Sequence, residues 1–154
     1  MTQQELLALA LALLPASSHA FFPTAGCAIT PDGTGHVNVP SGTTSIAQYA
    51  YFRCTALKTI SLPSSLNSVG NGAFQESGLT ALDLSTTSLT SVSASICKAC
   101  TSLASITFRS GLTSIGQSAF EKCSSLPSVD LRALAMTWHH HGIELSLRRM
   151  CQGV

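Results

Sequence analysis

The stretch that decides the fold runs from Leu103 to Leu126 and reads LASITFRSGLTSIGQSAFEKCSSL. Its pattern of apolar residues recurs along the 154-residue chain when the sequence is read backwards in steps of 23 residues. The aligned sets are Ile115, Val92, Val69 and Ile46; Cys123, Cys100, Ser77 and Cys54; Leu112, Leu89, Leu66 and Thr43; Phe120, Cys97, Phe74 and Tyr51; and Ala119, Ile96, Ala73 and Ala50. A period of this length is typical of solenoid proteins.

Each copy begins with a short run in which apolar and polar residues alternate, as in a half-buried strand. These runs are His36 to Val39, Thr59 to Leu62, Ala81 to Leu84, Ser105 to Phe108 and Ser128 to Leu131. The third copy drops one residue after Ser77 and regains one before Leu89, so its strand is one residue out of step. Strands this short are not stable alone, and we expect them to stack as a parallel ladder along one side of a solenoid.

The second part of each copy reads aliphatic-Gly-x-x-Ala-Phe-x-x-Cys. Neighbours three and four residues apart in Ala-Phe-x-x-Cys predict a single helical or 3₁₀ turn. The glycines that follow the aliphatic residue, Gly70 and Gly116, indicate tight backbone. The predicted fold class is therefore a repeat solenoid of leucine-rich-repeat type, with parallel strands on one side and turns with short helical or 3₁₀ segments on the other. A low-complexity Ser/Thr/Leu run that mimics a repeat is the alternative.

The pattern SIGQSAFEKCSSLPSVDL, from Ser114 to Leu131, resembles the leucine-rich repeats of the BspA-like class. The resemblance spans about His36 to Leu131, and it implies a secreted or surface-exposed solenoid that binds a partner and catalyses nothing. It carries over no catalytic residue. The third unit departs from the motif, since Ser93, Ile96 and Cys97 replace Gly, Ala and Phe.

The chain divides into four parts. Residues 1–20 contain the unbroken apolar run Leu6 to Leu14, which is too short to span a bilayer but has the length of a signal-peptide core. We expect a cleaved secretory signal; a short buried or amphipathic helix is the alternative. Residues 21–35 form a lead-in, residues 36–131 the solenoid of about four repeats, and residues 132–154 either a C-terminal cap or the truncated end of a longer array.

The composition disfavours an electrostatic partner such as nucleic acid. Only 10% of residues are charged, the formal net charge is +1, and no run of Lys or Arg occurs. We expect no transmembrane segment. The polar surface must consist largely of Ser, Thr and Asn.

A candidate binding face follows from the alternation, because strand residues that point away from the core form parallel columns. The partner would be a protein or a glycan, and a merely solvated face is the alternative. The candidate residues are His36, Asn38, Thr59, Ser61, Asp83, Ser105, Thr107, Arg109, Ser128, Asp130 and Arg132.

The six cysteines admit more than one interpretation. Cys100 and Cys123 belong to an apolar column, so burial explains them, although stacked layers also bring them near each other. A secretory signal would permit disulfides elsewhere, such as Cys27 to Cys54. Cys97 and Cys100 form a C-x-x-C pair, and a thiol redox or metal-binding protein is therefore an alternative function, but no second ligand pair has zinc spacing. His139 to His141 form a surface tract, and we expect no metal, cofactor or catalytic residue.

Overall fold

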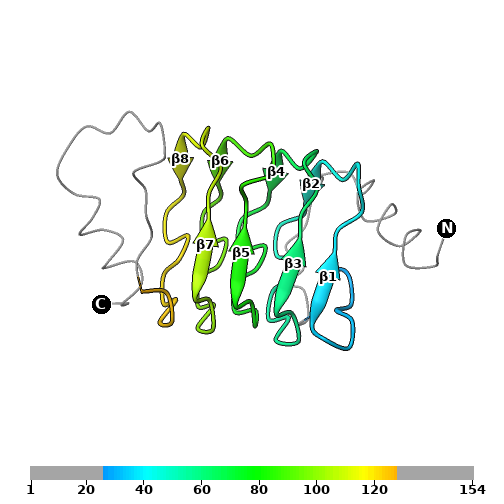
Figure 1. Cartoon of the computed structure of the whole chain (residues 1–154). Helices are drawn as coiled ribbons and strands as arrows, with labels where there is room; N and C mark the ends of the chain where they lie inside the picture. Colours follow the sequence, from blue (N-terminus) through cyan, green and yellow to red (C-terminus); the bar gives the residue numbers. More distant parts are fainter. Residues whose placement is uncertain (1–25, 128–154) are drawn as a thin grey trace.

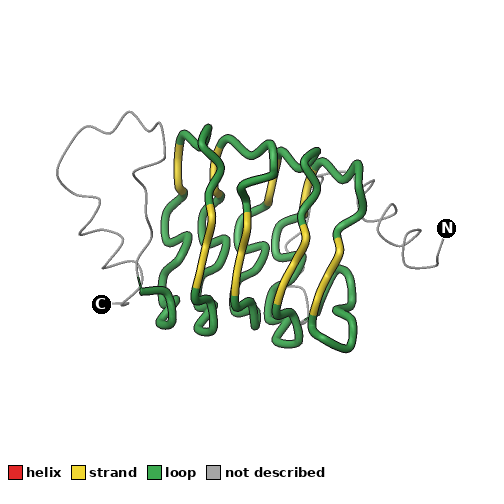
Figure 2. Tube along the Cα trace, viewed as in Figure 1, coloured by secondary structure: helices red, strands yellow, loops and turns green. Residues whose placement is uncertain are grey.

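The computed structural model describes residues 26–127, which wind into a solenoid whose turns lie side by side (Figure 1). Each turn contributes one strand of three residues and one of two residues, and the two kinds form separate rows (Figure 2). The longer strands are β1 (His36–Asn38), β3 (Thr59–Ser61), β5 (Ala81–Asp83) and β7 (Ser105–Thr107). The shorter strands are β2 (Ser45–Ile46), β4 (Ser68–Val69), β6 (Ser91–Val92) and β8 (Ser114–Ile115).

The strand pairing confirms the repeat register. β1 pairs with β3, and β2 with β4, both parallel and offset by one period, so that Val37 lies opposite Ile60 and Ile46 opposite Val69. β5 also pairs with β7 in parallel, but the offset is one residue longer than the period, so that Leu82 lies opposite Ile106. The third copy causes this difference, because it loses one residue before β5 and regains one after it. β3 and β5 lie side by side, but no strand pairing joins them.

The shorter strands were not predicted as strands. No strand was predicted for the segments ending in Ile46, Val69, Val92 and Ile115, whereas each forms a second two-residue strand. Their serines are exposed and their aliphatic residues point inward, where Ile46, Val69 and Val92 are buried. These four aliphatic residues therefore lie in a row along the solenoid, as the repeat requires.

The core is the stack of the inward columns. Two leucine columns are almost fully buried, as are the aromatic and cysteine columns between them. Tyr51 stacks on Phe74 with ring centroids 5.4 Å apart, and Phe108 meets Phe120 edge-on at 6.0 Å. Because each layer supplies only a handful of these side chains, burial of any one layer depends on the layers beside it.

The side of the solenoid opposite the strands contains turns. The predicted helical or 3₁₀ segment is wrong for the described units, since no helix occurs anywhere in residues 26–127. The backbone hydrogen bonds give the reason. In the first layer the amides of Tyr49, Tyr51 and Arg53 donate to carbonyls of the second layer, while the residues between them donate within their own layer. A helix would keep all these bonds in one layer, whereas here every second bond joins two layers.

This alternation requires left-handed backbone at two positions of each layer. The φ angle lies between +55° and +62° at Tyr49, Gly72, Ser95 and Ser118, and at Arg53, Glu76, Ala99 and Lys122. Only one of these eight residues is glycine, although left-handed backbone disfavours residues that carry a β-carbon. Ion pairs join neighbouring layers at or next to the second of these positions. They link Arg53 to Glu76 at 2.7 Å and Lys98 to Glu121 at 3.0 Å. Exposed pairs of this kind contribute little to stability.

Many serine and threonine hydroxyls also join the layers. Seven of them donate to a backbone carbonyl that lies 22 to 24 residues earlier in the chain. The donors are Ser65, Thr80, Ser88, Ser93, Thr113, Ser124 and Ser125. The hydroxyl-rich composition therefore serves the fold as well as the surface, because each such bond satisfies a carbonyl oxygen between the layers.

The lead-in covers part of the first layer. Gly26 and Ala28 donate to the carbonyls of Phe52 and Ala50, where a preceding layer would donate. A disulfide joins Cys27 to Cys54, with Cα atoms 5.1 Å apart, and this bears out one pairing that the sequence permitted. At the edge strand β1, both the amide and the carbonyl of His36 bond to Asp32. These contacts occupy backbone groups that could otherwise pair with a strand of another molecule.

Candidate binding face

The longer strands carry two columns of outward side chains, and the structure brings most of the candidate residues together there (Figure 1). The first column contains His36, Thr59, Ala81 and Ser105, and the second contains Asn38, Ser61, Asp83 and Thr107. Ser128, Asp130 and Arg132 lie outside the described residues. The face is formed by short polar side chains on a rigid ladder, so a partner could approach the backbone closely.

One end of the face contains a hydrogen-bonded trio. The Nδ1 atom of His36 lies 2.8 Å from the hydroxyl of Thr59, and its Nε2 atom lies 3.2 Å from the hydroxyl of Ser61. The imidazole thus bridges two side chains of the adjacent strand and fixes their rotamers. Both ring nitrogens therefore lie within hydrogen-bond distance of a hydroxyl of the neighbouring strand.

Other positions of the face have polar groups that the fold does not use. Within residues 26–127, the side chains of Asn38, Ser105 and Thr107 make no hydrogen bond to protein. Asp83 accepts one bond, from the backbone amide of Ser85 at 2.8 Å, and its second carboxylate oxygen stays available. These four side chains are the ones that could bind a ligand without loss of an existing contact.

Arg109 lies at the border of this face. Its guanidinium donates to the carbonyl oxygen of Leu89 at 3.3 Å, and the side chain is half-buried. The arginine therefore reaches from the loop after β7 to the loop between β5 and β6 of the preceding layer. The shorter strands carry a further column of outward side chains that was not proposed from the sequence. It consists of the exposed serines Ser45, Ser68, Ser91 and Ser114. The recurring pair of a serine and an aliphatic residue in each repeat is the signal that would have identified this column.

The thiols of the cysteine column lie in the core. Cys97, Cys100 and Cys123 are fully buried, and none of them is in a disulfide. Cys100 donates to the carbonyl of Phe74 at 2.9 Å, and Cys123 to that of Cys97 at 3.1 Å. A hydrogen bond with Cys100, together with complete burial, raises the pKa of the Cys97 thiol well above its ordinary value. The same hydrogen bond lowers the pKa of the Cys100 thiol. Both thiols are buried, so a packing role accounts for the C-x-x-C pair without redox chemistry.

A metal site was not expected, and no cluster of three or more His, Cys, Asp or Glu side chains suited to a metal occurs within residues 26–127. The histidine tract from His139 to His141 lies outside these residues. In the same range, no helix has the length and apolar character needed to cross a bilayer.

No curated protein matches the chain. Among solved structures, it is similar to a leucine-rich repeat protein from Bacteroides ovatus ATCC 8483, with 21% identity and a TM-score of 0.35 over 63% of this chain. The chain spans 37% of the length of that protein.

The family assignment follows from the repeat itself. The model of the BspA type leucine rich repeat region matches in six copies over residues 33–139, which is more than half of the chain. The matched range includes residues 33–127, in which the structure stacks the repeated apolar residues in columns. The chain therefore belongs to the BspA type leucine-rich repeat family.

Proposed function

We propose that this protein is a secreted or cell-surface binding module that contacts a protein partner through the face formed by β1, β3, β5 and β7, without catalysis. The observation that carries the proposal is the set of polar side chains on this face that the fold leaves without a partner. Asn38, Ser105 and Thr107 are such side chains, and Asp83 adds a carboxylate. Leucine-rich repeats commonly use an extended strand face for binding.

The character of the face predicts weak or multivalent contact. Tight interfaces usually depend on buried Trp, Tyr or Arg side chains, and the two described columns contain none of these. We therefore expect a single copy to bind weakly and several copies on one surface to bind by avidity. A glycan partner remains an outcome that the same experiment would reveal.

The test compares two double variants of the mature chain, displayed in several copies on beads and incubated with extracellular material. Asn38→Ala with Thr107→Ala removes two side chains from the proposed face, and neither substitution breaks a hydrogen bond within the described residues. Ser68→Ala with Ser91→Ala is the matched control on the shorter strands. Selective loss of the captured protein in the face variant supports the proposal. Equal capture by both variants, or retention of glycan alone, contradicts it.

Secretion is a separate part of the proposal, supported by the apolar run from Leu6 to Leu14 and the small residues that follow it. The Cys27–Cys54 disulfide is compatible with an oxidising compartment. Mass spectrometry of the protein from the culture medium should give a mature chain that begins at Phe21. A chain that retains Met1 and stays in the cell would contradict this part.

A further inference from the structure

Asn71 is an exposed asparagine that is followed directly by a glycine. The other two asparagines of the chain, Asn38 and Asn67, precede Val39 and Ser68. In an Asn-Gly pair the backbone nitrogen of the glycine reaches the side-chain carbonyl carbon of the asparagine most easily, because the glycine has no β-carbon to obstruct the approach. Within residues 26–127 the side chain of Asn71 makes no hydrogen bond that would hold it away.

The peptide unit between Asn71 and Gly72 joins three layers of the solenoid. Its carbonyl oxygen accepts a hydrogen bond from the amide of Tyr49 in the first layer, at 3.2 Å. Its N–H group donates to the carbonyl of Ala94 in the third layer, at 3.1 Å. Gly72 is buried, and the ring of Tyr49 lies against it. An attack by the Gly72 nitrogen turns this planar unit and uses its N–H group, so both bonds must break first. The stack therefore protects the pair.

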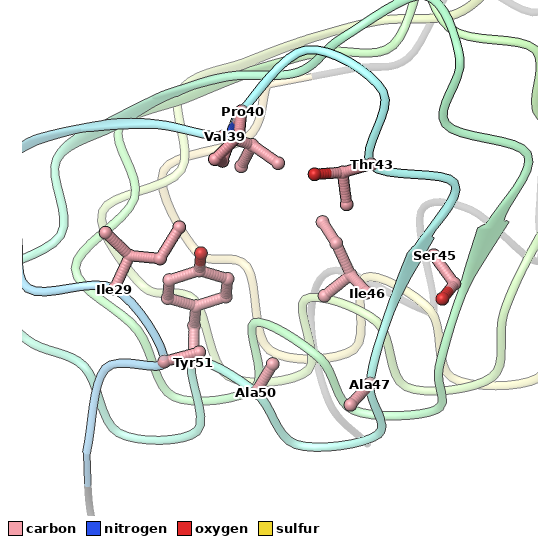
Figure 3. Close-up of a pocket in the computed structure, with 10 residues that line it drawn as sticks. Ile29, Val39, Pro40, Thr43, Ser45, Ile46, Ala47, Ala50 and Tyr51 are labelled. Atoms are coloured by element: carbon pink, nitrogen blue, oxygen red, sulfur yellow. The ribbon is translucent and has the colours of Figure 1, made fainter. Parts of the chain in front are cut away.

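The first layer is an end layer with incomplete packing. Thr43 stands there in the column that leucines fill in the next three layers. Figure 3 shows the hollow that remains between Thr43, Ile29 and Val39. Local opening costs least where packing is sparse, so the hydrogen bond from Tyr49 should break more readily than the bonds between interior layers.

We propose that Asn71 is a site of spontaneous covalent modification, and that the opening of the layers sets its rate. In the open state the Gly72 nitrogen forms a bond to the side-chain carbonyl carbon of Asn71. The C–N bond of the side-chain amide breaks, and ammonia leaves with the proton of the Gly72 nitrogen. Water then hydrolyses the succinimide that results. Cleavage at the former side-chain carbonyl gives aspartate, and cleavage at the backbone carbonyl gives isoaspartate.

The isoaspartate product no longer joins the three layers. Its main chain runs through the former side chain, so the link to Gly72 is one carbon longer and the former backbone carbonyl of Asn71 becomes a carboxylate. We expect this product to lose the bonds to Tyr49 and Ala94, and the first layer then separates from the rest of the stack. The modification site lies apart from the strand face and does not depend on the proposed function.

The first experiment compares the folded with the unfolded chain. The full 154-residue protein is kept at mildly alkaline pH with and without guanidinium chloride, and peptide mapping by mass spectrometry follows each asparagine. In guanidinium chloride we expect Asn71 to be converted faster than Asn38 and Asn67. In the folded chain its conversion should be slower by about tenfold or more. Equal rates in the two states, or faster conversion of another asparagine in guanidinium chloride, would overturn the proposal.

Reduction of the Cys27–Cys54 disulfide tests the part played by the first layer. The disulfide fastens the lead-in to this layer. A phosphine reductant should therefore raise the rate at Asn71 in the folded chain by about twofold or more, and leave the rate in guanidinium chloride unchanged. The variant with Cys27→Ala and Cys54→Ala should show the raised rate without reductant. No rise in the folded chain, or an equal rise in both states, contradicts control by the layers.

A last measurement tests the effect of the product. Protein with isoaspartate at position 71 is isolated by ion exchange, and its amide exchange is compared with that of Asn71→Gln kept under the same conditions. The longer glutamine side chain forms the corresponding ring far more slowly. We expect faster exchange at the Tyr49 and Gly72 amides in the isoaspartate form alone, with Asn71→Asp as the control for the added charge. Unchanged exchange in the isoaspartate form would show that the layers stay joined, against the proposal.

Discussion

Gly70 lies directly against Gln48 of the preceding layer, and a β-carbon on Gly70 would come within 2.3 Å of the Gln48 amide nitrogen. Gly116 has the same relation to Ala94, at 2.4 Å. The close approach is between backbones and does not depend on a positive φ at either glycine. The glycine of the motif therefore sets the spacing between layers.

Replacement of Gly70 by Ala should destabilise the protein, because backbone atoms cannot move aside as the end of a side chain can. We expect a loss of about 1–3 kcal/mol in the free energy of unfolding, measured by urea denaturation. The matched control is Gly111→Ala, whose nearest neighbour is the end of the Arg109 side chain at 3.4 Å. Equal stability of the two variants would show that the layers can separate at no cost.

Ile96 and Cys97 form a compensating pair in the third layer. They replace the Ala and Phe of the motif, and both are fully buried. The larger side chain at Ile96 offsets the smaller one at Cys97, so the layer keeps its volume by another arrangement. Phe74 and Phe120 occupy the aromatic column in the layers on either side.

A double-mutant cycle tests this compensation. Cys97→Phe alone overpacks the layer, and Ile96→Ala alone leaves a cavity, so each should lower the unfolding free energy by about 1–5 kcal/mol. The double variant restores the motif and should lose less than the sum of the two, by about 1 kcal/mol or more. Additive losses would mean that the two positions do not share volume.

The sequence was sufficient to predict the stacked columns, because eight apolar positions held one period through each copy. It also indicated the odd register of β5, since a dropped residue must shift the pairing. The two-residue strands and the turn ladder could not be predicted in this way. Local spacing at Ala119, Phe120 and Cys123 fits a helical turn, and only the neighbouring layer redirects alternate amide bonds.

The alternation of apolar and polar residues predicted the candidate face. It did not show which side chains of the face bond to one another and which stay without a partner. Nothing in the spacing of His36, Thr59 and Ser61 shows that the imidazole bridges both hydroxyls.

The left-handed turn positions predict an unusual effect of glycine. Ala99 has a φ of +58°, which costs about 1–2 kcal/mol for a residue with a β-carbon. Ala99→Gly should therefore raise the unfolding free energy, by about 0.5–1 kcal/mol after the added entropy of the unfolded chain is subtracted. Ala104→Gly is the control at an exposed position without positive φ, and it should be destabilising. Destabilisation of similar size by both variants would argue against strain at Ala99.

The disulfide fastens the lead-in to the first layer. Its two cysteines are 27 residues apart, and cross-links of this kind stabilise by about 2–4 kcal/mol. Replacement of Cys27 and Cys54 by Ala should lower the melting temperature and speed amide exchange at Ala28, which bonds to Ala50. Reductant should lower the stability of the wild-type chain to that of the variant and leave the variant unchanged. A reductant effect of equal size on both would place the relevant cross-link elsewhere.

Asp32 predicts a pH dependence at the edge of β1. Hydrogen bonds to its carboxylate from the hydroxyl of Thr34 and from the amides of His36 and Thr34 lower its pKa from 3.8 to about 2. Because the pKa is lower in the folded state, the stabilising contribution is present above about pH 4 and is lost as the pH falls through 2. The carboxyl signal of Asp32 and the amide signals of Thr34 and His36 should titrate together near pH 2. In Asp32→Asn this titration should disappear, whereas a carboxyl midpoint near 3.8 would show that the turn does not hold the anion.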